Sequence, residues 1–332
     1  MLLNTDSSAP ACREIVPDEA GNDPLPADII EVPGSVANLG GGFDTLAVAV
    51  RLYLRLRVVE VRDDGGAMLT VVGSTPPVRG RNAVERAFEA IARGTGRRAP
   101  SVLVEVVSEI PMAAGLGSSA AAAVAGLRAF ERVAGPVPKG VLLGVAASLE
   151  GHADNAAAAL YGGLTSVVED EGRQPRALCW HWPDEIRVIV ATPSTRLPTS
   201  KARAVLSDAI PRGDAVFNLQ RVLSLVHALQ SGAYDRLRDA VQDRWHQSAR
   251  AALVPQLEAA LALEDPEILG TFLSGAGPSV ALLARRDFMR IEHLVKTVYE
   301  RAGCPATIRT LAVHQSSEVL PGVLASAHGQ AR

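Results

Sequence analysis

One short stretch constrains the fold of this chain more than any other. Residues 109–130 read EIPMAAGLGSSAAAAVAGLRAF. The apolar residues 101–110 predict a strand, and residues 118–134 predict an alanine-rich helix. Gly115 and Gly117 lie in the loop between them, and glycine accepts positive φ and has no Cβ. Such a loop can direct several backbone N–H groups to one point. The stretch therefore predicts either a phosphate cradle or a buried helix that follows a flexible loop.

A helix that begins directly after the loop supports the first interpretation. The N-terminus of a helix carries uncompensated N–H groups and a partial positive charge, which together bind phosphate. Ser118 and Ser119 open the helix, and the Ser119 hydroxyl could contact a metal ion on that phosphate. The loop is not a P-loop, because Ser118 stands where that motif has a lysine. The chain also has no GxGxxG fingerprint after a strand, so dinucleotide binding is not indicated.

The order of the predicted elements favours an α+β fold over a doubly wound parallel sheet. Leu52, Leu54 and Leu56 alternate with arginines and predict a half-buried strand at 52–61, which we expect to form a hairpin with a strand at 68–72. The other expected strands are 28–32, 101–110, 162–169, 186–192 and 306–312, with a strand, loop and strand in 271–284. The expected helices are 82–93, 118–134, 139–150, 199–206, 214–231, 233–243, 255–264 and 288–301.

Composition excludes several classes of partner. The chain has 332 residues and a formal net charge of −3, without a block of lysines and arginines, which argues against nucleic acid and anionic membranes. Aromatic residues are only 4%, so a stacking surface for single strands is not expected. We find no apolar run long enough to span a bilayer and no secretory signal. Cys12, Cys179 and Cys304 are far apart and predict reduced thiols in a cytoplasmic protein.

Three glycine-rich segments together resemble a known superfamily. PMAAGLGSSAAAA is similar to the phosphate-loop motif of the GHMP kinases, and VANLGGGFD (36–44) and LSGAGPSVALLA (273–284) resemble their first and third motifs. All three occur in the order typical of the superfamily, and the similarity covers residues 29–312. Within the superfamily the chain most resembles homoserine kinases, where SANLGPGFD and EGHPDNVAPALFGG are typical. The second of these corresponds to EGHADNAAAALYGG at 150–163.

The resemblance implies a two-domain GHMP fold. The N-terminal domain would resemble domain 2 of ribosomal protein S5 and the C-terminal domain would be ferredoxin-like. We expect a mobile extension at residues 1–28, an N-terminal domain with the phosphate loop at 29–183 and a C-terminal domain at 184–332. The implied reaction is the ATP- and Mg²⁺-dependent phosphorylation of the hydroxyl of L-homoserine, which gives O-phospho-L-homoserine in threonine biosynthesis. The implied partner is a small molecule, and a homodimer is compatible with this interpretation.

The resemblance also implies nucleotide and metal sites. Phosphoryl transfer depends on positioning and on charge neutralisation, so the site needs a triphosphate cradle and oxygen ligands for Mg²⁺. Ser119 and Glu150 match the residues close to the metal, although Glu150 alone could be a solvated acid at a helix end. Gly275 and Gly277 either line the nucleotide site or form a purely structural hairpin. The implied nucleotide-binding residues are Asn82, Pro111, Gly115, Leu116, Gly117, Ser118, Ser119, Ala120, Gly275 and Gly277.

Asp154 and Asn155 match the catalytic positions of the superfamily. In mevalonate kinases the aspartate that matches Asp154 is regarded as the base, whereas in homoserine kinases the hydroxyl proton could pass directly to the γ-phosphate. Without the resemblance, Asp154 would be interpreted as the N-cap of the next helix. Asn155 would position polar groups of the substrates.

The acceptor is expected to be a small amino-acid alcohol. Asp44 would bind its ammonium group, and Arg203 and Arg250 would bind its carboxylate as bidentate forks. Asn38 and His152 match further acceptor-binding positions. The structural alternatives are a turn for Asp44, surface cations for Arg203 and Arg250, and a core histidine for His152.

Three departures from the homoserine kinase pattern bear on the acceptor. Ser248 and Ala249 replace Pro-Tyr beside Arg250, Gly41 replaces proline, and residues 47–48 replace Gly-Leu. The alternatives to homoserine are therefore another small hydroxy acid or amino-acid alcohol. A nucleotide-binding protein of the same fold without catalysis is an alternative of a different class.

Overall fold

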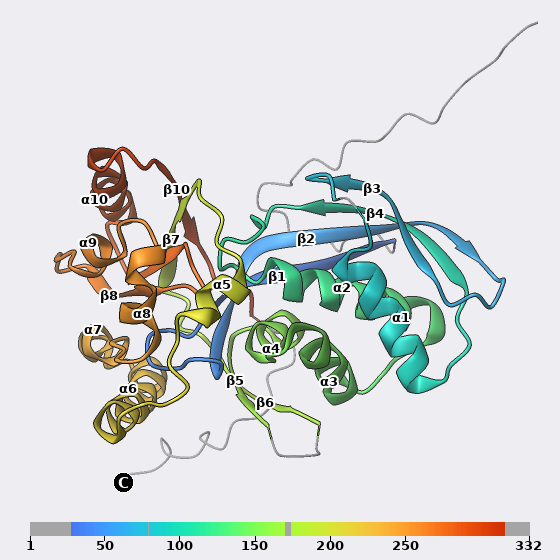
Figure 1. The fold of residues 1–332 in the computed structure, drawn as a ribbon, viewed down its shortest axis with the longest axis horizontal. Coiled ribbons are helices and arrows are strands. Elements are labelled where there is room, and N and C mark those ends of the chain that lie inside the picture. The colour runs from blue at the N-terminus through green and yellow to red at the C-terminus, as the bar shows by residue number, and fades with distance from the viewer. Residues whose placement is uncertain (1–27, 79, 170–173, 316–332) are drawn as a thin grey trace, which may run out of the picture.

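The computed structural model describes residues 28–78, 80–169 and 174–315. The predicted N-terminal extension lies outside these residues except for Asp28, and so does Cys12. The described chain forms two sheets, each covered by helices, which lie side by side along the long axis of the molecule (Figure 1). This mixed architecture confirms the α+β prediction.

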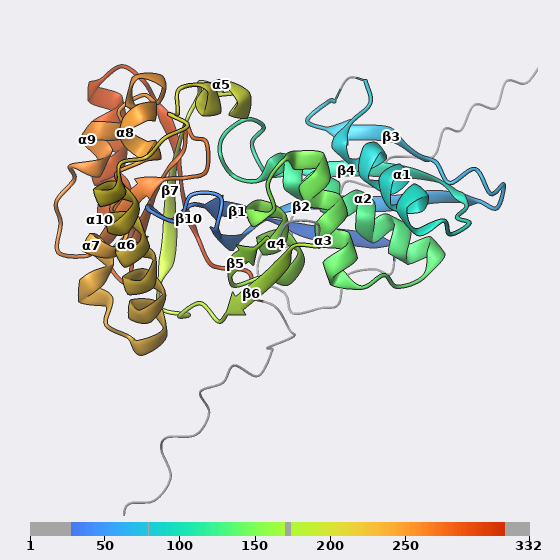
Figure 2. The same ribbon diagram turned by 60° about the horizontal axis from the view of Figure 1, so that its bottom comes forward.

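The first sheet contains the six N-terminal strands, in the order β3-β4-β2-β5-β6 with β1 paired to β2. Its strands are β1 (Ile29–Ala37), β2 (Leu46–Arg62), β3 (Leu69–Thr75), β4 (Ser101–Ser108), β5 (Leu164–Val168) and β6 (Arg176–Trp180). Figures 1 and 2 show that four helices cover one face of this sheet: α1 (Ala83–Thr95), α2 (Ser118–Ala134), α3 (Lys139–Glu150) and α4 (Asp154–Tyr161). Leu52, Leu54 and Leu56 of β2 are buried, which confirms the predicted alternation.

The predicted hairpin of β2 and β3 is wrong. β4 pairs antiparallel with β2 and lies between the two strands, and β3 pairs with β4 in parallel. The parallel pair needs a crossover, which α1 supplies. This arrangement buries the apolar side chains Val84, Phe88 and Ile91 of α1, which a hairpin of β2 and β3 would not require.

The second sheet is antiparallel and has the ferredoxin-like order β10-β7-β9-β8. Its strands are β7 (Arg187–Pro193), β8 (Ile268–Leu273), β9 (Val280–Ala284) and β10 (Ala306–Leu311). The helices of this half are α5 (Thr199–Ala204), α6 (Arg212–Ser231), α7 (Leu237–Ala240), α8 (His246–Arg250), α9 (Leu257–Leu261) and α10 (Phe288–Arg301). Two of the elements, β6 and α8, were not expected from the sequence.

The end of the described chain joins the two halves. After β10 the chain returns to the first sheet, where Arg51 N donates to Ala312 O (2.9 Å) and His314 N donates to Ala49 O (2.9 Å). One hydrophobic core contains residues of both sheets, such as Leu56 and Val190. The division of the chain at residues 183 and 184 stays a proposal, since the core is continuous across it.

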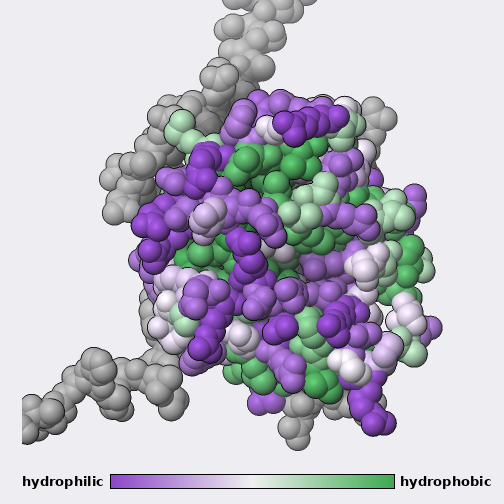
Figure 3. Space-filling view, turned by 90° about the vertical axis from the view of Figure 1, so that its left-hand side faces the viewer, coloured by the Kyte–Doolittle hydropathy of each residue, from purple (hydrophilic) through white to green (hydrophobic). Residues whose placement is uncertain are grey.

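The surface of the second half is mixed in polarity. Figure 3 shows separate hydrophobic areas between hydrophilic side chains on this face. Val216, Leu219 and Leu223 of α6 are exposed apolar residues. No helix within the described ranges is long and apolar enough to cross a membrane. Cys179 and Cys304 are free thiols, as expected.

The packing of α1 on α2 generates a stability prediction. A Cβ on Gly126 of α2 would overlap the backbone carbonyl of Val84 in α1, whereas a Cβ on Gly94 of α1 would meet nothing within 4 Å. We expect Gly126→Ala to lower the free energy of unfolding by about 1–3 kcal/mol, because the two helices must separate. The matched control, Gly94→Ala, should leave it unchanged or raise it by up to about 1 kcal/mol. Urea denaturation of both variants measures this, and equal stabilities would contradict the close approach.

Candidate active site

The loop before α2 has the geometry of an anion cradle. Gly115 and Gly117 have φ of 78° and 69°, which is the left-handed region that favours glycine. Gly117 is the N-cap of α2 and provides no side-chain cap, so the first N–H groups of the helix are open to a ligand. Neither glycine has room for a side chain. A Cβ on Gly115 would overlap Ser274 O, and one on Gly117 would overlap the hydroxyl of Ser35.

Hydrogen bonds from the second half of the chain, which carries the second sheet, hold this loop on the side away from the cavity. Ser274 Oγ donates to Gly115 O (2.6 Å), Ser279 N donates to Ala114 O (3.2 Å), and Leu197 N donates to Ala113 O (3.1 Å). Because three successive carbonyl groups are bonded to the second half, the conformation of the loop depends on both halves of the molecule.

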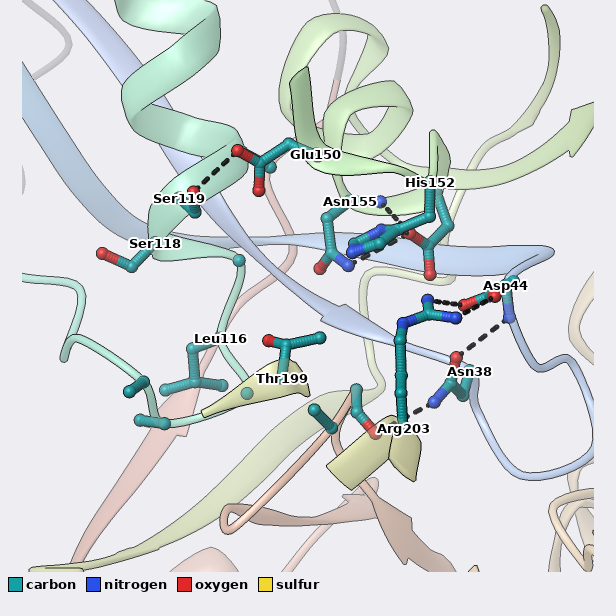
Figure 4. A pocket seen from close by; sticks show the side chains of 18 of the residues that line it. Asn38, Asp44, Leu116, Ser118, Ser119, Glu150, His152, Asn155, Thr199 and Arg203 are labelled. Carbon is teal, nitrogen blue, oxygen red and sulfur yellow. Dashed lines mark hydrogen bonds and ion pairs between the residues drawn. The ribbon is translucent and has the colours of Figure 1, made fainter. Parts of the chain in front are cut away.

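A cavity of about 250 Å³ opens in front of the loop. Figure 4 shows the side chains on its wall. Most of the residues predicted from the sequence line it: Asn38, Asp44, Gly115, Leu116, Gly117, Ser118, Ser119, Ala120, Glu150, His152, Asp154, Asn155, Arg203, Arg250 and Gly275. Residues from six segments far apart in the sequence therefore meet at one place.

Three predicted residues lie outside this wall. Asn82 lines the neighbouring cavity and is the N-cap of α1, in a complete capping box with Glu85. Pro111 lines neither cavity. Gly277 lies behind the loop, where a Cβ would come within 3.0 Å of side chains of Leu273 and Val254.

Ser119 and Glu150 form a pair of oxygen ligands at one end of the cavity. The Ser119 hydroxyl, in the first turn of α2, donates to Glu150 Oε1 at the end of α3 (2.7 Å). The described residues contain no group of three or more His, Cys, Asp or Glu that could hold a metal ion. A hydroxyl and one carboxylate fit Mg²⁺, which usually keeps several waters and is completed by substrate phosphates.

A chain of hydrogen bonds fixes the centre of the cavity. Asp154 is only 2% exposed, and its Oδ1 accepts hydrogen bonds from His152 Nδ1 (2.8 Å), Asn155 N (2.8 Å) and Asn155 Nδ2 (3.1 Å). Ser35 Oγ donates to Asn155 Oδ1 (2.8 Å) and so determines which way the amide faces. The bond to Asp154 raises the pKa of His152 and outweighs the effect of burial. Oδ2 of Asp154 accepts no hydrogen bond from the described residues.

The N-cap interpretation of Asp154 is wrong. Asp154 is the first residue of α4, the N-cap is Ala153, and no side chain caps the helix. Asp154 lies on the cavity wall, and its Oδ1 bonds to His152 and Asn155 instead of to the first N–H groups of the helix.

Asp44 and Arg203 form an ion pair at the other end of the cavity. Both guanidinium Nη atoms of Arg203 donate to the carboxylate, at 2.9 and 2.6 Å. Asp44 has a φ of 52°, and Asn38 Oδ1 accepts a hydrogen bond from its backbone N–H (3.2 Å). Asn38 Nδ2 in turn donates to Gly275 O (3.0 Å), which links this end to the segment behind the phosphate loop.

Arg250 is a buried cation on the same wall. It is 2% exposed and has no carboxylate of the described residues within ion-pair distance. Its Nε donates to Ala202 O (3.0 Å) and its Nη1 donates to Gly275 O (3.1 Å). Burial, and then the nearby charge of Arg203, lower the pKa of Arg250 to about 10. The carboxylates of Asp44 and Asp243 offset this desolvation cost only in part, and an anion bound here would offset more of it.

A second cavity, of about 320 Å³, adjoins the first. The two share Ala113, Ser118 and Ser119 at the start of α2. The lining of the second cavity is mainly apolar and comes from β2, β3, α1, β4, α2 and the loops that follow β3 and β4. Leu54, Val71, Val78, Val84, Val106, Met112 and Ala122 are among its residues.

The cavity wall also contains residues that sequence reasoning missed. These are Phe43, Ala113, Ala114 and Thr199. Each lies inside or beside one of the motifs described above, so its position next to a motif could have predicted it. Ser35, which orients Asn155, also lies one residue before the first motif.

The departures from the homoserine kinase pattern lie away from the cavity. Gly41, Ala47, Val48, Ser248 and Ala249 are absent from its wall, and Ala47 and Val48 are completely buried in the first sheet. Ser248 is exposed on α8. These residues therefore do not line the acceptor pocket, so they cannot change it by direct contact as expected.

Comparisons with known proteins show the family of this chain. Residues 82–163 match the family model of the GHMP kinases N terminal domain, and residues 225–298 match that of the GHMP kinases C terminal domain. The homoserine kinase of Solibacter usitatus is 37% identical over 278 residues, which is 82% of this chain and 90% of that protein. The homoserine kinase of Deinococcus radiodurans is 37% identical over 300 residues, or 88% and 96% of the two chains.

A solved structure extends the similarity to the whole fold. The crystal structure of homoserine kinase from Cytophaga hutchinsonii matches with a TM-score of 0.76 and 25% identity, over 90% of this chain and 98% of that one. The mevalonate kinase of Methanococcus jannaschii has the same fold, with a TM-score of 0.60 and 13% identity. With both domains matched and relatives of this identity along most of its length, the chain belongs to the GHMP kinases and, among them, to the homoserine kinase family.

Proposed function

We propose that this protein transfers the γ-phosphoryl group of ATP to the hydroxyl of L-homoserine and forms O-phospho-L-homoserine. One observation carries the proposal. A single cavity has a glycine loop with open helix N–H groups and the oxygen pair of Ser119 and Glu150 at one end, and charges of both signs at the other, with Asp154 and Asn155 on its wall. Figure 4 shows Ser118 and Ser119 on one side and Asp44, Asn38 and Arg203 on the other.

The charged end suits an amino acid with a free backbone. Asp44 supplies a carboxylate for the ammonium group, and Arg203 and Arg250 supply guanidinium groups for the carboxylate. Without acceptor, Asp44 and Arg203 neutralise each other. An acceptor with both charges can replace each partner of that pair, so neither Asp44 nor Arg203 loses its counter-charge. An acceptor with one charge leaves one of them unpaired, which is costly in a partly buried site.

The nucleotide would occupy both cavities. Its phosphates would accept hydrogen bonds from the N–H groups around Gly117 and the first turn of α2, and its base and ribose would fill the apolar second cavity beside Asn82. Ser119 and Glu150 would hold Mg²⁺, which would neutralise charge on the phosphates. Asn155 and Asp154 would position the acceptor hydroxyl, with the unbonded Oδ2 of Asp154 as the group to receive its proton. A cytoplasmic location and a homodimer stay predictions from the sequence.

The acceptor is tested by a panel that separates its two charges. We expect ADP release, in a coupled assay with ATP and Mg²⁺, with L-homoserine as acceptor. 4-Hydroxybutanoate lacks the ammonium group and 3-aminopropan-1-ol lacks the carboxylate, and both should be turned over at least about 100-fold less efficiently, since each loses a charge-assisted contact. Mevalonate and galactose serve as controls for other GHMP acceptors.

The panel also tests the alternatives. Turnover of another alcohol but not of homoserine would replace the proposed acceptor. The absence of ADP release with every acceptor would favour a binding protein without catalysis.

The metal ligands generate a second prediction. Glu150→Gln keeps the size of the side chain and removes its charge, so kcat should fall by at least about 100-fold while the fold is kept. Glu258→Gln, on the exposed side of α9, is the matched control and should have wild-type kcat. Circular dichroism and the coupled assay measure the two properties. A wild-type kcat for Glu150→Gln would remove Glu150 from the metal site.

The acceptor end generates a third prediction. Arg203→Leu should raise KM for homoserine about 10–100-fold and change KM for ATP far less, because the lost contacts are to the carboxylate. Lys201→Leu changes an exposed cation of the same helix and should leave both constants unchanged. Equal increases of both KM values for Arg203→Leu would mean that Arg203 has a structural role only.

A further inference from the structure

His246 lies directly behind the acceptor end of the cavity. It is the first residue of α8, is completely buried and does not line the cavity. Its Nε2 is 2.9 Å from Gly40 O, and its Nδ1 is 3.2 Å from Nη1 of Arg250. The imidazole therefore bridges the loop that carries Asp44 and the guanidinium group of Arg250.

These two contacts allow only one protonation state. A carbonyl oxygen accepts hydrogen bonds, so Nε2 must carry the hydrogen, and a guanidinium only donates, so Nδ1 must be the acceptor. His246 is therefore neutral, with its hydrogen on Nε2. An imidazolium would direct an N–H at Arg250 and bring two cations together. Burial lowers the pKa of His246, in agreement with the neutral form.

The acidic neighbour of His246, Asp243, lies too far from the imidazole for a hydrogen bond, and both of its oxygens already accept other hydrogen bonds. Asp243 Oδ2 is 3.9 Å from Nε2, but it already accepts from the backbone N–H groups of His246 and Gln247, both at 2.8 Å. Its Oδ1 accepts from Asn218 Nδ2 (2.8 Å). The Phe43 ring lies against both partners, 5.4 Å from the His246 ring and 5.3 Å from the Arg250 guanidinium.

We infer that His246 is a positioning residue for acceptor recognition, because its unprotonated Nδ1 orients Arg250 so that the guanidinium presents its free edge to the acceptor carboxylate. The inference rests on the proposed function of the acceptor site. Arg250 has three hydrogen-bond partners among the described residues, and two of them, Ala202 O and Gly275 O, are backbone carbonyls. His246 is thus the one side chain among these partners. Nη2 of Arg250 has no partner among them and remains for the ligand.

The bridge also connects the two charges that the acceptor needs. Gly40 belongs to the loop between β1 and β2, which carries Asn38 and Asp44. A Cβ on Gly40 would overlap Val241 O, so the backbone of this loop packs directly on the second half of the chain. The bond to Gly40 O therefore anchors the imidazole against this loop, and Nδ1 on its other side faces Arg250.

Two substitutions separate the two contacts of the imidazole. The amide of glutamine in His246→Gln can reach the position of Nε2 and donate to Gly40 O, but it leaves Arg250 without its acceptor. The amide oxygen of asparagine in His246→Asn lies near the position of Nδ1 and can accept from Arg250. We expect His246→Gln to raise KM for homoserine about 10-fold or more, with KM for ATP unchanged, and His246→Asn to stay within about 3-fold of wild type.

Three kinetic results would overturn the inference. They are an unchanged KM for homoserine in His246→Gln, an equal rise of both KM values, and the reverse order of the two variants. If His246 served only to pack the core, both variants would lose stability, and KM for homoserine would not rise selectively over KM for ATP. If the acceptor panel identifies another carboxylate-bearing substrate, the same comparison applies to it, so failure of homoserine as the acceptor does not decide the role of His246.

A measurement without turnover covers variants that fail to fold. In ¹⁵N-labelled wild-type protein, the imidazole resonances of His246 should report a hydrogen on Nε2 and none on Nδ1, from pH 6 to 8. Addition of L-homoserine should shift the Nδ1 resonance, because the carboxylate changes the hydrogen bond that Arg250 donates. A hydrogen on Nδ1, an imidazolium, or an Nδ1 resonance that does not respond to any carboxylate-bearing acceptor that binds would overturn the inference.

Discussion

The whole site depends on the hydrogen bonds that hold the glycine loop to the second half of the chain. Ser274, Ser279 and Leu197 bind the carbonyl groups of residues 113–115, and the backbone approaches Gly115 so closely that no side chain fits. Because the carbonyl groups point backward into these bonds, the N–H groups of the loop and of the first turn of α2 are left for an anion. A loop that only followed a strand would have no reason to keep this conformation, since glycine allows many others.

The charged groups at the other end of the cavity are also held in place by contacts that leave them available to a ligand. Arg250 is buried without a carboxylate partner, whereas Arg203 and Asp44 satisfy each other. The first arrangement favours a bound anion, and in the proposed function the second would exchange its partners when a zwitterion binds. Backbone carbonyls and one histidine hold Arg250 in place, so the acceptor end is pre-organised by neutral groups that do not compete with a ligand for its charge.

Local chemistry explains which parts of the fold were predictable. The bounds of α2, α3 and α10 agree with the prediction because glycine, proline and charged residues mark their ends, and the capping box of Asn82 and Glu85 determines where α1 begins. The failures are of another kind. β3 pairs with β4 instead of β2, because strand pairing between distant segments is not marked by local residues. The short helix α8 was not expected, and Asp154 lies one residue after the N-cap, where its carboxylate bonds to His152 and Asn155 and does not cap α4.

By itself, the sequence determined the family motifs, the helix that follows the phosphate loop and the residue types that phosphoryl transfer needs. Those properties are local, and the spacing of glycines, serines and charged residues carries them. The tertiary structure alone decided that Ser35 orients Asn155, that Asp44 pairs with Arg203 and that His246 contacts Gly40 O. All three contacts join residues more than 100 positions apart, because hydrogen bonds in a buried site form between neighbours in space, whatever their separation along the chain.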